Sequence, residues 1–249
     1  MKPSDLFLSL VLPARNQADH IAALLRRHRE TLERWSDAGG GRFEIVVVPN
    51  ACSDDTPGIV HGLAGEDDRI VCRDIPLPGW GRAVRTGLAA SRGTALCYTN
   101  SARTDPAQVP ALVEVFLVSG GRFAKVRRMH RGAPVREIGS ALFNLEARLL
   151  YGCREGDVNG TPKILSRDLY EALALASDGD LLDLELMAKL KRLRIPAAEM
   201  PVEGFGRHGG RSSTTLRSAI RIYAGAWQLR GMIRGFEPGP AVGGREVRG

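Results

Sequence analysis

The sequence predicts one α/β domain in which helices cover both faces of an open, mostly parallel β-sheet. From residue 7 to about 118, short apolar runs rich in branched residues alternate with stretches of helical periodicity. Each apolar run stops at a proline or a polar turn, as buried parallel strands do. With 249 residues and 43% hydrophobic content, the chain is long enough to bury the core of one such domain.

Strands and helices follow one another regularly in the first half of the chain. The runs "LSLVL" at 8–12 and "FEIVVV" at 43–48 are the first two expected strands. Between them, apolar residues recur on one face of a helix that starts near Ile21, and arginines fall on the other face. The cycle then repeats, with expected helices at 56–63 and 82–91 and expected strands at 69–73 and 95–99.

The second half is less regular. Its expected parts are a basic stretch at 122–136, a helix at 138–151, a loop at 154–165, a helix at 181–193, an edge strand at 197–203 and a glycine-rich loop at 204–213. An amphipathic run follows at 214–235, and the tail is rich in glycine and proline, which predicts disorder. We therefore expect one domain over 1–235, with halves at 1–118 and 119–235, and a flexible tail at 236–249.

Composition narrows the class of partner. The formal charge of +7 favours anionic partners such as nucleotides, phosphates or an acidic membrane surface. The four cysteines are widely spaced and show no zinc-site spacing, which predicts a reduced, cytoplasmic setting. We see no secretory signal and no run of about 20 apolar residues that would span a bilayer. With 6% aromatic residues and no matching motif, the sequence argues against nucleic-acid binding.

In open parallel sheets, ligands bind beyond the carboxyl ends of the strands. The loops at 13–17, 49–55, 77–82 and 99–106 each follow an expected strand or precede an expected helix. We expect all four loops to line one crevice.

Five short motifs occur in a fixed order along these loops and into the second half. They are "PARNQ" at 13–17, "PNACSDD" at 49–55, "GWGRAVRTG" at 79–87, "DLE" at 183–185 and "RHGGRSS" at 207–213. In this order they resemble the family 2 inverting glycosyltransferases of the GT-A fold. The resemblance is strongest to the branch with dolichyl-phosphate mannosyltransferase and bacterial polyprenyl-phosphate sugar transferases, and it covers residue 8 to about 215.

The resemblance implies a nucleoside diphosphate sugar, with UDP or GDP, as donor, bound by the half at 1–118. Asp54 either holds the ribose or caps its helix. Arg85 either meets an anion at a helix start or lies solvated in a turn. The implied nucleotide-binding residues are Pro13, Ala14, Asn16, Asn50, Asp54, Gly79, Gly81, Arg82, Asn100, Ser101 and Ala102.

The family's metal-binding Asp-x-Asp falls on Asn100 and Ala102 in this chain. Mg²⁺ and Mn²⁺ prefer anionic oxygen ligands, and neither an amide nor a methyl group supplies a charge. We therefore assign no metal ligand and expect weak or no metal dependence, although Mg²⁺ or Mn²⁺ stays open as a cofactor. Asp105 is either a lone ligand or a helix cap, and the following proline favours the cap.

Without the metal, cations must meet the diphosphate charge. Guanidinium groups bind phosphate oxygens in bidentate fashion, so arginines can replace the ion, although charge runs are also common on solvated faces. The candidates are Arg103, Arg128, Lys163 and Arg211. The resemblance also makes Arg207 the arginine that meets donor or acceptor phosphate.

The catalytic candidates are Asp157, Glu185 and Arg207. By resemblance, Asp157 faces the acceptor and acts as general base for a hydroxyl, whereas a phosphate acceptor is already ionised and needs no base. Asp183 and Glu185 lie two residues apart, so on a helix they diverge and only one faces the crevice. We select Glu185.

The sequence thus predicts a glycosyltransferase acting on a polyprenyl phosphate or on a small-molecule or lipid hydroxyl. The run at 214–235 suits either peripheral contact with the inner face of a membrane or packing in a core or homodimer. The alternative is a non-catalytic relative that binds a nucleotide or a protein partner through the same crevice.

Overall fold

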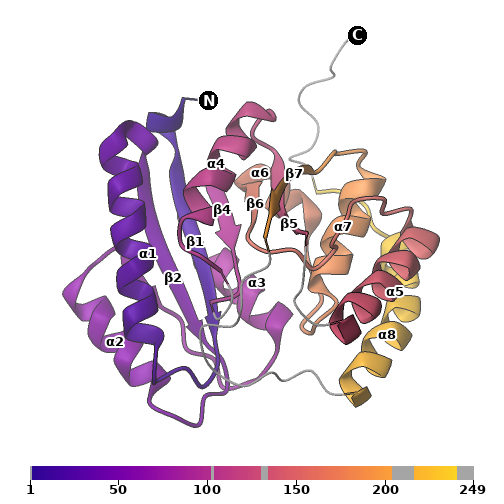
Figure 1. The fold of residues 1–249 in the computed structure, drawn as a ribbon, viewed down its shortest axis with the longest axis horizontal. Helices are drawn as coiled ribbons and strands as arrows, with labels where there is room; N and C mark the ends of the chain where they lie inside the picture. The colour runs from indigo at the N-terminus through magenta and orange to yellow at the C-terminus, as the bar shows by residue number, and fades with distance from the viewer. Residues whose placement is uncertain (1, 102–103, 130–133, 204–215, 240–249) are drawn as a thin grey trace.

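The computed structural model describes residues 2–101, 104–129, 134–203 and 216–239, with the backbone alone at 134–138 and 216–222 (Figure 1). Its centre is a seven-stranded sheet of order β3-β2-β1-β4-β6-β5-β7. β6 runs antiparallel to both of its neighbours and the other pairs are parallel, so the predicted mostly parallel sheet is confirmed. The strands are β1 (Phe7–Ala14), β2 (Arg42–Pro49), β3 (Ile70–Cys72), β4 (Ala95–Tyr98), β5 (Phe123–Arg128), β6 (Lys163–Ser166) and β7 (Ala198–Val202).

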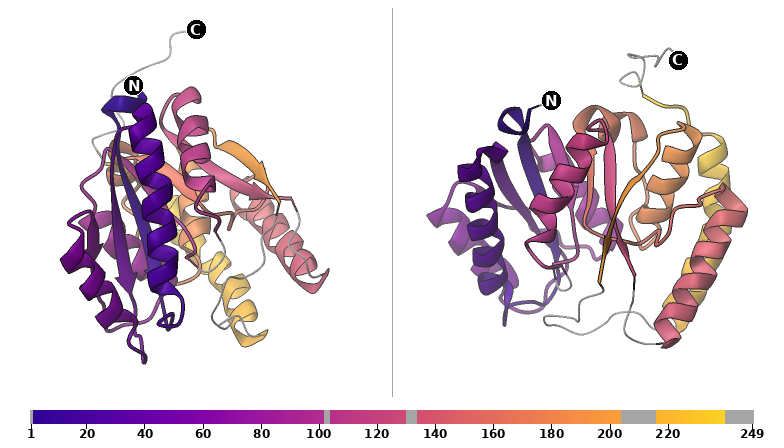
Figure 2. Two further views of the ribbon diagram at one scale, coloured as in Figure 1. Left: turned by 60° about the vertical axis from the view of Figure 1, so that its left-hand side comes forward. Right: turned by 45° about the horizontal axis from the view of Figure 1, so that its top comes forward.

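Helices cover both faces of the sheet (Figures 1 and 2). Successive strand residues point to opposite faces, so Leu8, Leu10 and Leu12 of β1 enter one core while Val11 enters the other. The first core takes residues from α1, α2 and α4, and the second takes residues from α3, α5, α6, α7 and α8. The helices are α1 (Ile21–Trp35), α2 (Thr56–Glu66), α3 (Trp80–Ala90), α4 (Gln108–Val118), α5 (Pro134–Tyr151), α6 (Arg167–Leu173), α7 (Leu182–Arg192) and α8 (Leu216–Arg234), with short turns at Pro3–Asp5 and Ser36–Gly40.

Two strands and one helix differ from the prediction. The stretch that we read as basic contains β5, and β6 begins inside the expected loop at 154–165 and leads directly into α6. Both strands carry a lysine, Lys125 and Lys163, that is fully buried. These lysines interrupt the apolar pattern by which a buried strand is read from sequence. The predicted edge position of β7 is confirmed.

The carboxyl-terminal segment packs further along the chain than predicted. Phe236 is buried, the Lys189 ammonium lies 4.8 Å from the centre of its ring, and Gly239 donates a backbone hydrogen bond to Ala172. The ordered domain thus extends past the expected boundary at residue 235, and most of the predicted tail lies outside the described residues. None of the helices within the described ranges is long and apolar enough to cross a membrane.

Candidate functional site

Hydrogen bonds tie together the loops that follow β1, β2 and β4. The Gln17 backbone donates to the Thr56 hydroxyl, and its side-chain amide donates to the Ser101 hydroxyl, both at 2.8 Å. The Ser101 hydroxyl also lies 3.0 Å from the Pro13 carbonyl oxygen. Gln17 and Ser101 are buried, so these bonds are shielded from water. The structure therefore brings three of the four predicted loops to one edge of the sheet.

Asn16 and Asp54 both hold backbone at this edge. Asn16 has a left-handed backbone with φ of 50°, and its side-chain oxygen accepts a hydrogen bond from the Ser53 backbone at 2.8 Å. Asp54 accepts from the backbone of Ala18 at 3.0 Å and of Thr56 at 3.1 Å. Desolvation opposes the change, but these bonds and one from the Thr56 hydroxyl lower the pKa of Asp54. Asp54 thus holds the backbone where α2 begins, one residue before the N-cap Asp55, and binding of a ribose by Asp54 stays a prediction.

Asn50 is buried and joins the ends of β1 and β2. Its side-chain amide donates to the Ala14 carbonyl at 2.8 Å, and its backbone donates to the same oxygen at 2.9 Å. Its backbone also pairs with that of Ile75, beyond β3. The amide of Asn50, which the resemblance places in nucleotide binding, therefore already has a partner in the protein, and nucleotide binding by Asn50 stays a prediction.

The glycines at the start of α3 face the protein's own backbone. A Cβ at Gly79 would lie 2.4 Å from the Asp178 carbonyl oxygen, and one at Gly81 would lie 2.3 Å from that of Ser177. The backbone N–H groups of Gly81 and Arg82 donate to Gly179 and Asp178. The resemblance places these glycines in nucleotide binding, but their close contact is with the segment before α7. The contacts seen at Gly79, Gly81 and Arg82 are thus with the protein itself, and nucleotide binding by these residues stays a prediction.

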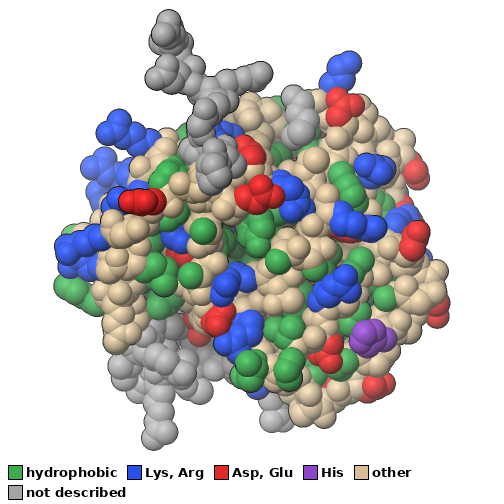
Figure 3. Space-filling view, turned by 180° about the vertical axis from the view of Figure 1, so that it is seen from behind, with side chains coloured by type: hydrophobic (Ala, Val, Ile, Leu, Met, Phe, Trp, Pro, Cys, Tyr) green, Lys and Arg blue, Asp and Glu red, His purple; other side chains and the backbone are tan. Residues whose placement is uncertain are grey.

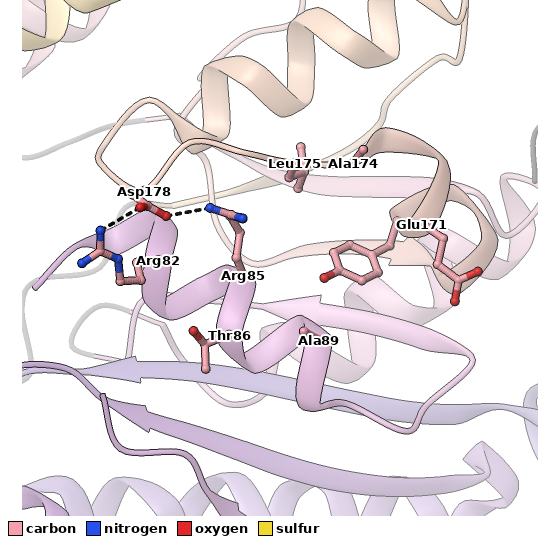
Figure 4. A pocket seen from close by; sticks show the side chains of 9 residues that line it. Arg82, Arg85, Thr86, Ala89, Glu171, Ala174, Leu175 and Asp178 are labelled. Carbon is pink, nitrogen blue, oxygen red and sulfur yellow. Dashed lines mark hydrogen bonds and ion pairs between the residues drawn. The ribbon is translucent and has the colours of Figure 1, made fainter. Parts of the chain in front are cut away.

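Arg82 and Arg85 project from α3 toward one carboxylate (Figure 4). Asp178 accepts from Arg82 at 2.7 Å and from Arg85 at 2.6 Å, and these two cations lower the pKa of Asp178. The three residues border a cavity of about 530 Å³ between α3, α6 and the segment at 174–178. Arg85 lies inside α3 and its guanidinium group is paired with Asp178. This differs from the alternative of a solvated arginine in a turn.

A row of polar side chains crosses four adjacent strands in register. Tyr98 of β4 pairs with Lys163 of β6, Lys163 pairs with Lys125 of β5, and Lys125 pairs with Glu199 of β7. Residues paired across a sheet project from the same face. Tyr98, Lys163 and Lys125 are fully buried. The two lysines therefore place charge inside the core of the half at 119–235.

Asp183 of α7 lies at one end of this row. Its carboxylate accepts from the Lys163 ammonium at 2.5 Å, from the Tyr98 hydroxyl at 2.7 Å and from the Trp80 indole at 3.3 Å. Burial lowers the pKa of Lys163 to about 8, with Asp183 acting in the opposite direction. Burial, together with Asp183, raises the pKa of Tyr98. Trp80 begins α3 and Tyr98 ends β4, and both belong to the half at 1–118. Asp183 therefore joins this half to β6 in the half at 119–235.

Asp157 forms a two-point ion pair with Arg128. Its oxygens accept from Arg128 Nε at 2.7 Å and from Nη2 at 2.8 Å, and one of them also accepts from the Arg128 backbone. Asp157 is 4% exposed and has a left-handed backbone with φ of 55°. Its carbonyl oxygen accepts from the Lys125 ammonium at 3.0 Å. Both carboxylate oxygens of Asp157 are therefore engaged by the Arg128 guanidinium.

Glu185 does not occupy the catalytic position that we selected for it. It is fully buried and accepts from the Lys189 ammonium at 2.6 Å and from the backbones of Ala176 at 2.9 Å and Ser177 at 2.7 Å. These bonds fix the segment before α7, and outweigh desolvation to lower the pKa of Glu185. The two acids do diverge as predicted, but Asp183 is the one that points to the strand ends. Asp183 sits opposite Tyr98 and Lys163, and only the sheet register reveals that arrangement.

The phosphate-binding candidates divide into two groups. Lys163 and Arg128 already bind Asp183 and Asp157, and Lys163 is fully buried, so its position does not support direct contact with a diphosphate. The remaining phosphate candidates, Arg103, Arg207 and Arg211, lie outside the described residues, as does Ala102 of the nucleotide-binding set.

The segment after β4 contains the positions that align with the family's metal-binding motif. Asp105 accepts a hydrogen bond from the Ala107 backbone at 3.1 Å, as expected for a residue that caps the turn before α4. Thr99 and Thr104 share a hydroxyl contact at 2.5 Å, and Asn100 is half-buried between them. Within the described ranges, no three His, Cys, Asp or Glu side chains gather as a metal site would require. Weak or no metal dependence stays a prediction, because residues 102 and 103 of this segment lie outside the described ranges.

The same architecture occurs in known proteins. Residues 9–173, about two thirds of the chain, match the family model of glycosyl transferase family 2. The chain belongs to this family. Glycosyltransferase AglD of Haloferax volcanii is 32% identical over 207 residues, which are 79% of this chain and 32% of that protein. Undecaprenyl-phosphate 4-deoxy-4-formamido-L-arabinose transferase of Pseudomonas fluorescens is 24% identical over 182 residues, 72% of this chain and 52% of that enzyme.

This family 2 chain therefore spans about a third to a half of the length of these curated relatives. Among solved structures, glucosyl-3-phosphoglycerate synthase of Mycobacterium tuberculosis, in complex with Mn²⁺, UDP and glucosyl-3-phosphoglycerate, superposes with a TM-score of 0.69. The two chains are 22% identical, and the match covers 90% of this chain and 80% of that one. This likeness confirms the predicted GT-A fold.

Proposed function

We propose that this family 2 chain transfers a sugar from a nucleoside diphosphate sugar to a polyprenyl phosphate. One observation carries the choice of acceptor. The two buried carboxylates beside the strand ends, Asp157 and Asp183, are each bound to a cation, Arg128 and Lys163. A hydroxyl acceptor needs a general base, whereas a phosphate monoester has a second pKa of about 6 and is ionised without one.

The proposed reaction is a single displacement at the anomeric carbon. A phosphate oxygen of the acceptor attacks that carbon, the bond to the nucleoside diphosphate breaks, and the diphosphate leaves with the electron pair. The names of the undecaprenyl-phosphate transferases, which are 24% identical to this chain, support a lipid phosphate as acceptor. UDP as the donor nucleotide is supported by the UDP in the complex of the M. tuberculosis enzyme, which shares the fold.

The cations that meet the leaving diphosphate are proposed to be Arg103, Arg207 and Arg211, because Arg128 and Lys163 are already paired. Low metal dependence belongs to the same proposal, since Asn100 and Ala102 stand where the family carries its two aspartates. A polyprenyl chain is confined to a bilayer, so the protein also has to work at a membrane surface.

A matched pair of acceptors tests the proposal. We expect a UDP- or GDP-sugar and a polyprenyl phosphate to give glycosylated lipid, and the corresponding polyprenol to give none. Asp157→Asn should slow transfer to the phosphate only a few-fold, because an amide keeps most of the shape and some of the hydrogen bonds. Melting curves of the variant control for the weakened pair with Arg128.

Two results would contradict the proposal. Transfer to the alcohol that is abolished by Asp157→Asn would make Asp157 a general base and the acceptor a hydroxyl. Binding of the nucleotide with no transfer to either acceptor would support the alternative of a non-catalytic nucleotide-binding relative.

A further inference from the structure

Helix α5 presents a row of leucines to solvent. Leu142, Leu145 and Leu149 are 53%, 51% and 75% exposed. Their spacing of three and four residues places them on one stripe of the helix. Phe143 and Ala147, on the opposite side, are buried in the core. The helix is thus apolar on both sides, and only one side is covered by the described residues.

Helix α8 continues this apolar surface. Trp227 is 59% exposed and Met232 is 43% exposed. Burial raises the pKa of Glu146, which lies on α5 between Leu145 and Leu149, and the neighbouring Trp227 side chain acts in the opposite direction. Figures 1 and 2 show α5 and α8 side by side, and the Tyr223 hydroxyl of α8 donates to the Gly139 carbonyl of α5 at 2.8 Å. We call the five exposed residues the α5–α8 face: Leu142, Leu145, Leu149, Trp227 and Met232.

Arginines surround the α5–α8 face. Arg148 is exposed and precedes Leu149, and Arg234 is exposed and lies two residues after Met232. The Arg230 guanidinium lies 5.5 Å from the centre of the Trp227 ring. Seen from behind in Figure 3, lysine and arginine side chains stand out along the left-hand edge of the molecule. Leucines flanked by tryptophan and arginine are typical of helices that lie in the interface of an anionic membrane. There the leucines reach the acyl region and the arginines stay among the lipid phosphates.

We propose that the α5–α8 face docks onto an anionic lipid bilayer. The inference rests on the proposed function in one respect, because a polyprenyl phosphate acceptor would lie in that bilayer. Figure 1 shows both helices starting at the end of the molecule toward which β1 and β2 point. The face itself lies along the later turns of both helices, at 142–149 of α5 and 227–232 of α8.

Vesicle sedimentation tests the docking. We expect the wild-type chain to bind vesicles of phosphatidylglycerol and phosphatidylcholine, and to bind pure phosphatidylcholine more weakly. The triple variant Leu142→Gln, Leu145→Gln, Leu149→Gln should reduce binding to the anionic vesicles by at least about tenfold, because three apolar side chains no longer enter the acyl region. Leu149→Gln and Val118→Gln form a matched pair, since Val118 is 87% exposed but lies on α4. Only the first should weaken binding.

Tryptophan fluorescence locates the contact. Brominated acyl chains should quench the emission of the vesicle-bound protein, and Trp227→Phe should remove most of that quenching while Trp35 and Trp80 remain. Quenching that persists in Trp227→Phe would mean that another surface meets the lipid, and would overturn the proposal. Exposed leucines contribute little to the stability of the fold, so the triple variant should have the same melting temperature as the wild type.

Two further measurements separate this inference from its alternatives. If sedimentation velocity shows a dimer that the triple variant dissociates, and vesicles bind neither protein, the face belongs to a second copy of the chain. Transfer to a short, water-soluble prenyl phosphate without vesicles should proceed equally in the wild type and the triple variant. Transfer without vesicle binding would refute the docking alone, whereas vesicle binding without transfer would refute the proposed function alone.

Discussion

The two halves of the molecule hold their strand ends together by different interactions. In residues 1–118, the loops after β1, β2 and β4 are joined mainly by hydrogen bonds of neutral groups, such as Gln17 to Ser101, and the one carboxylate among them, Asp54, accepts from backbone N–H groups and has no cation as partner in the contacts described above. In residues 119–235, buried lysines pair with carboxylates, as Lys163 does with Asp183 and Lys125 with Glu199. A neutral hydrogen bond contributes about 1 kcal/mol, but a buried charge that loses its partner costs several times more. The second half should therefore be the more sensitive to single substitutions.

The strongest test of this comparison is Lys163→Met. It leaves the Asp183 carboxylate buried without its cation, so we expect a loss of about 3–5 kcal/mol in the free energy of unfolding, measured in urea. Gln17→Leu, which removes a buried neutral hydrogen bond in the first half, should cost about 1–3 kcal/mol and serves as the control. The comparison fails if the two losses are equal. The double variant Lys163→Met, Asp183→Leu should recover much of the stability, because neither charge of this pair then remains buried.

Arg207 carries the next largest expected effect, on catalysis. If the glycine-rich loop closes over a phosphate, Arg207→Ala should lose a charge-assisted contact worth roughly 1.5–3 kcal/mol, about ten- to a hundredfold in transfer rate or apparent affinity. Arg207→Lys should recover part of this, because an ammonium lacks the planar fork. Arg26→Ala, on the exposed side of α1, is the control. A stable Arg207→Ala protein with full activity would remove this residue from the site.

Glu185 gives a pH-dependent prediction. Its pKa is lowered in the folded protein, so its carboxylate stabilises the fold at pH values above the ordinary value of 4.5. That contribution disappears as the pH falls below 4.5 and through the lowered pKa. We expect Glu185→Gln to be less stable than the wild type by about 1–3 kcal/mol at pH 7, and to approach it in acid. Equal differences at pH 7 and pH 3 in urea unfolding would contradict a role for the carboxylate charge.

Removal of metal should have the smallest effect. Calorimetry of UDP or GDP binding is expected to give nearly the same affinity in EDTA and in Mn²⁺, because the aligned positions hold an amide and a methyl group. A collapse of affinity on chelation, restored by manganese, would make Asp105 or another carboxylate a ligand. It would also show that our alignment of the Asp-x-Asp segment is wrong.

Local patterns were sufficient where the chain is neutral and regular. The alternation of apolar runs and amphipathic helices predicted β1 to β4 and α1 to α3 within a few residues, because burial on both faces leaves a continuous apolar signal. The same patterns failed at β5 and β6, where Lys125 and Lys163 stand inside the core. A lysine in a sequence reads as a surface residue until a partner is found for it.

The sequence alone determined the fold class, the loops that meet at one edge of the sheet and the family. Tertiary structure alone decided the partners of the charged groups. The packing of α7 against β4 and β6 decides which of Asp183 and Glu185 faces the strand ends. Asp183 binds Tyr98 and Lys163 there, whereas Glu185 accepts hydrogen bonds from the segment before α7. The glycines of α3 are likewise explained by the backbone at 177–179, nearly a hundred residues away. Pairing across such separations is set by packing and register, and no local periodicity encodes it.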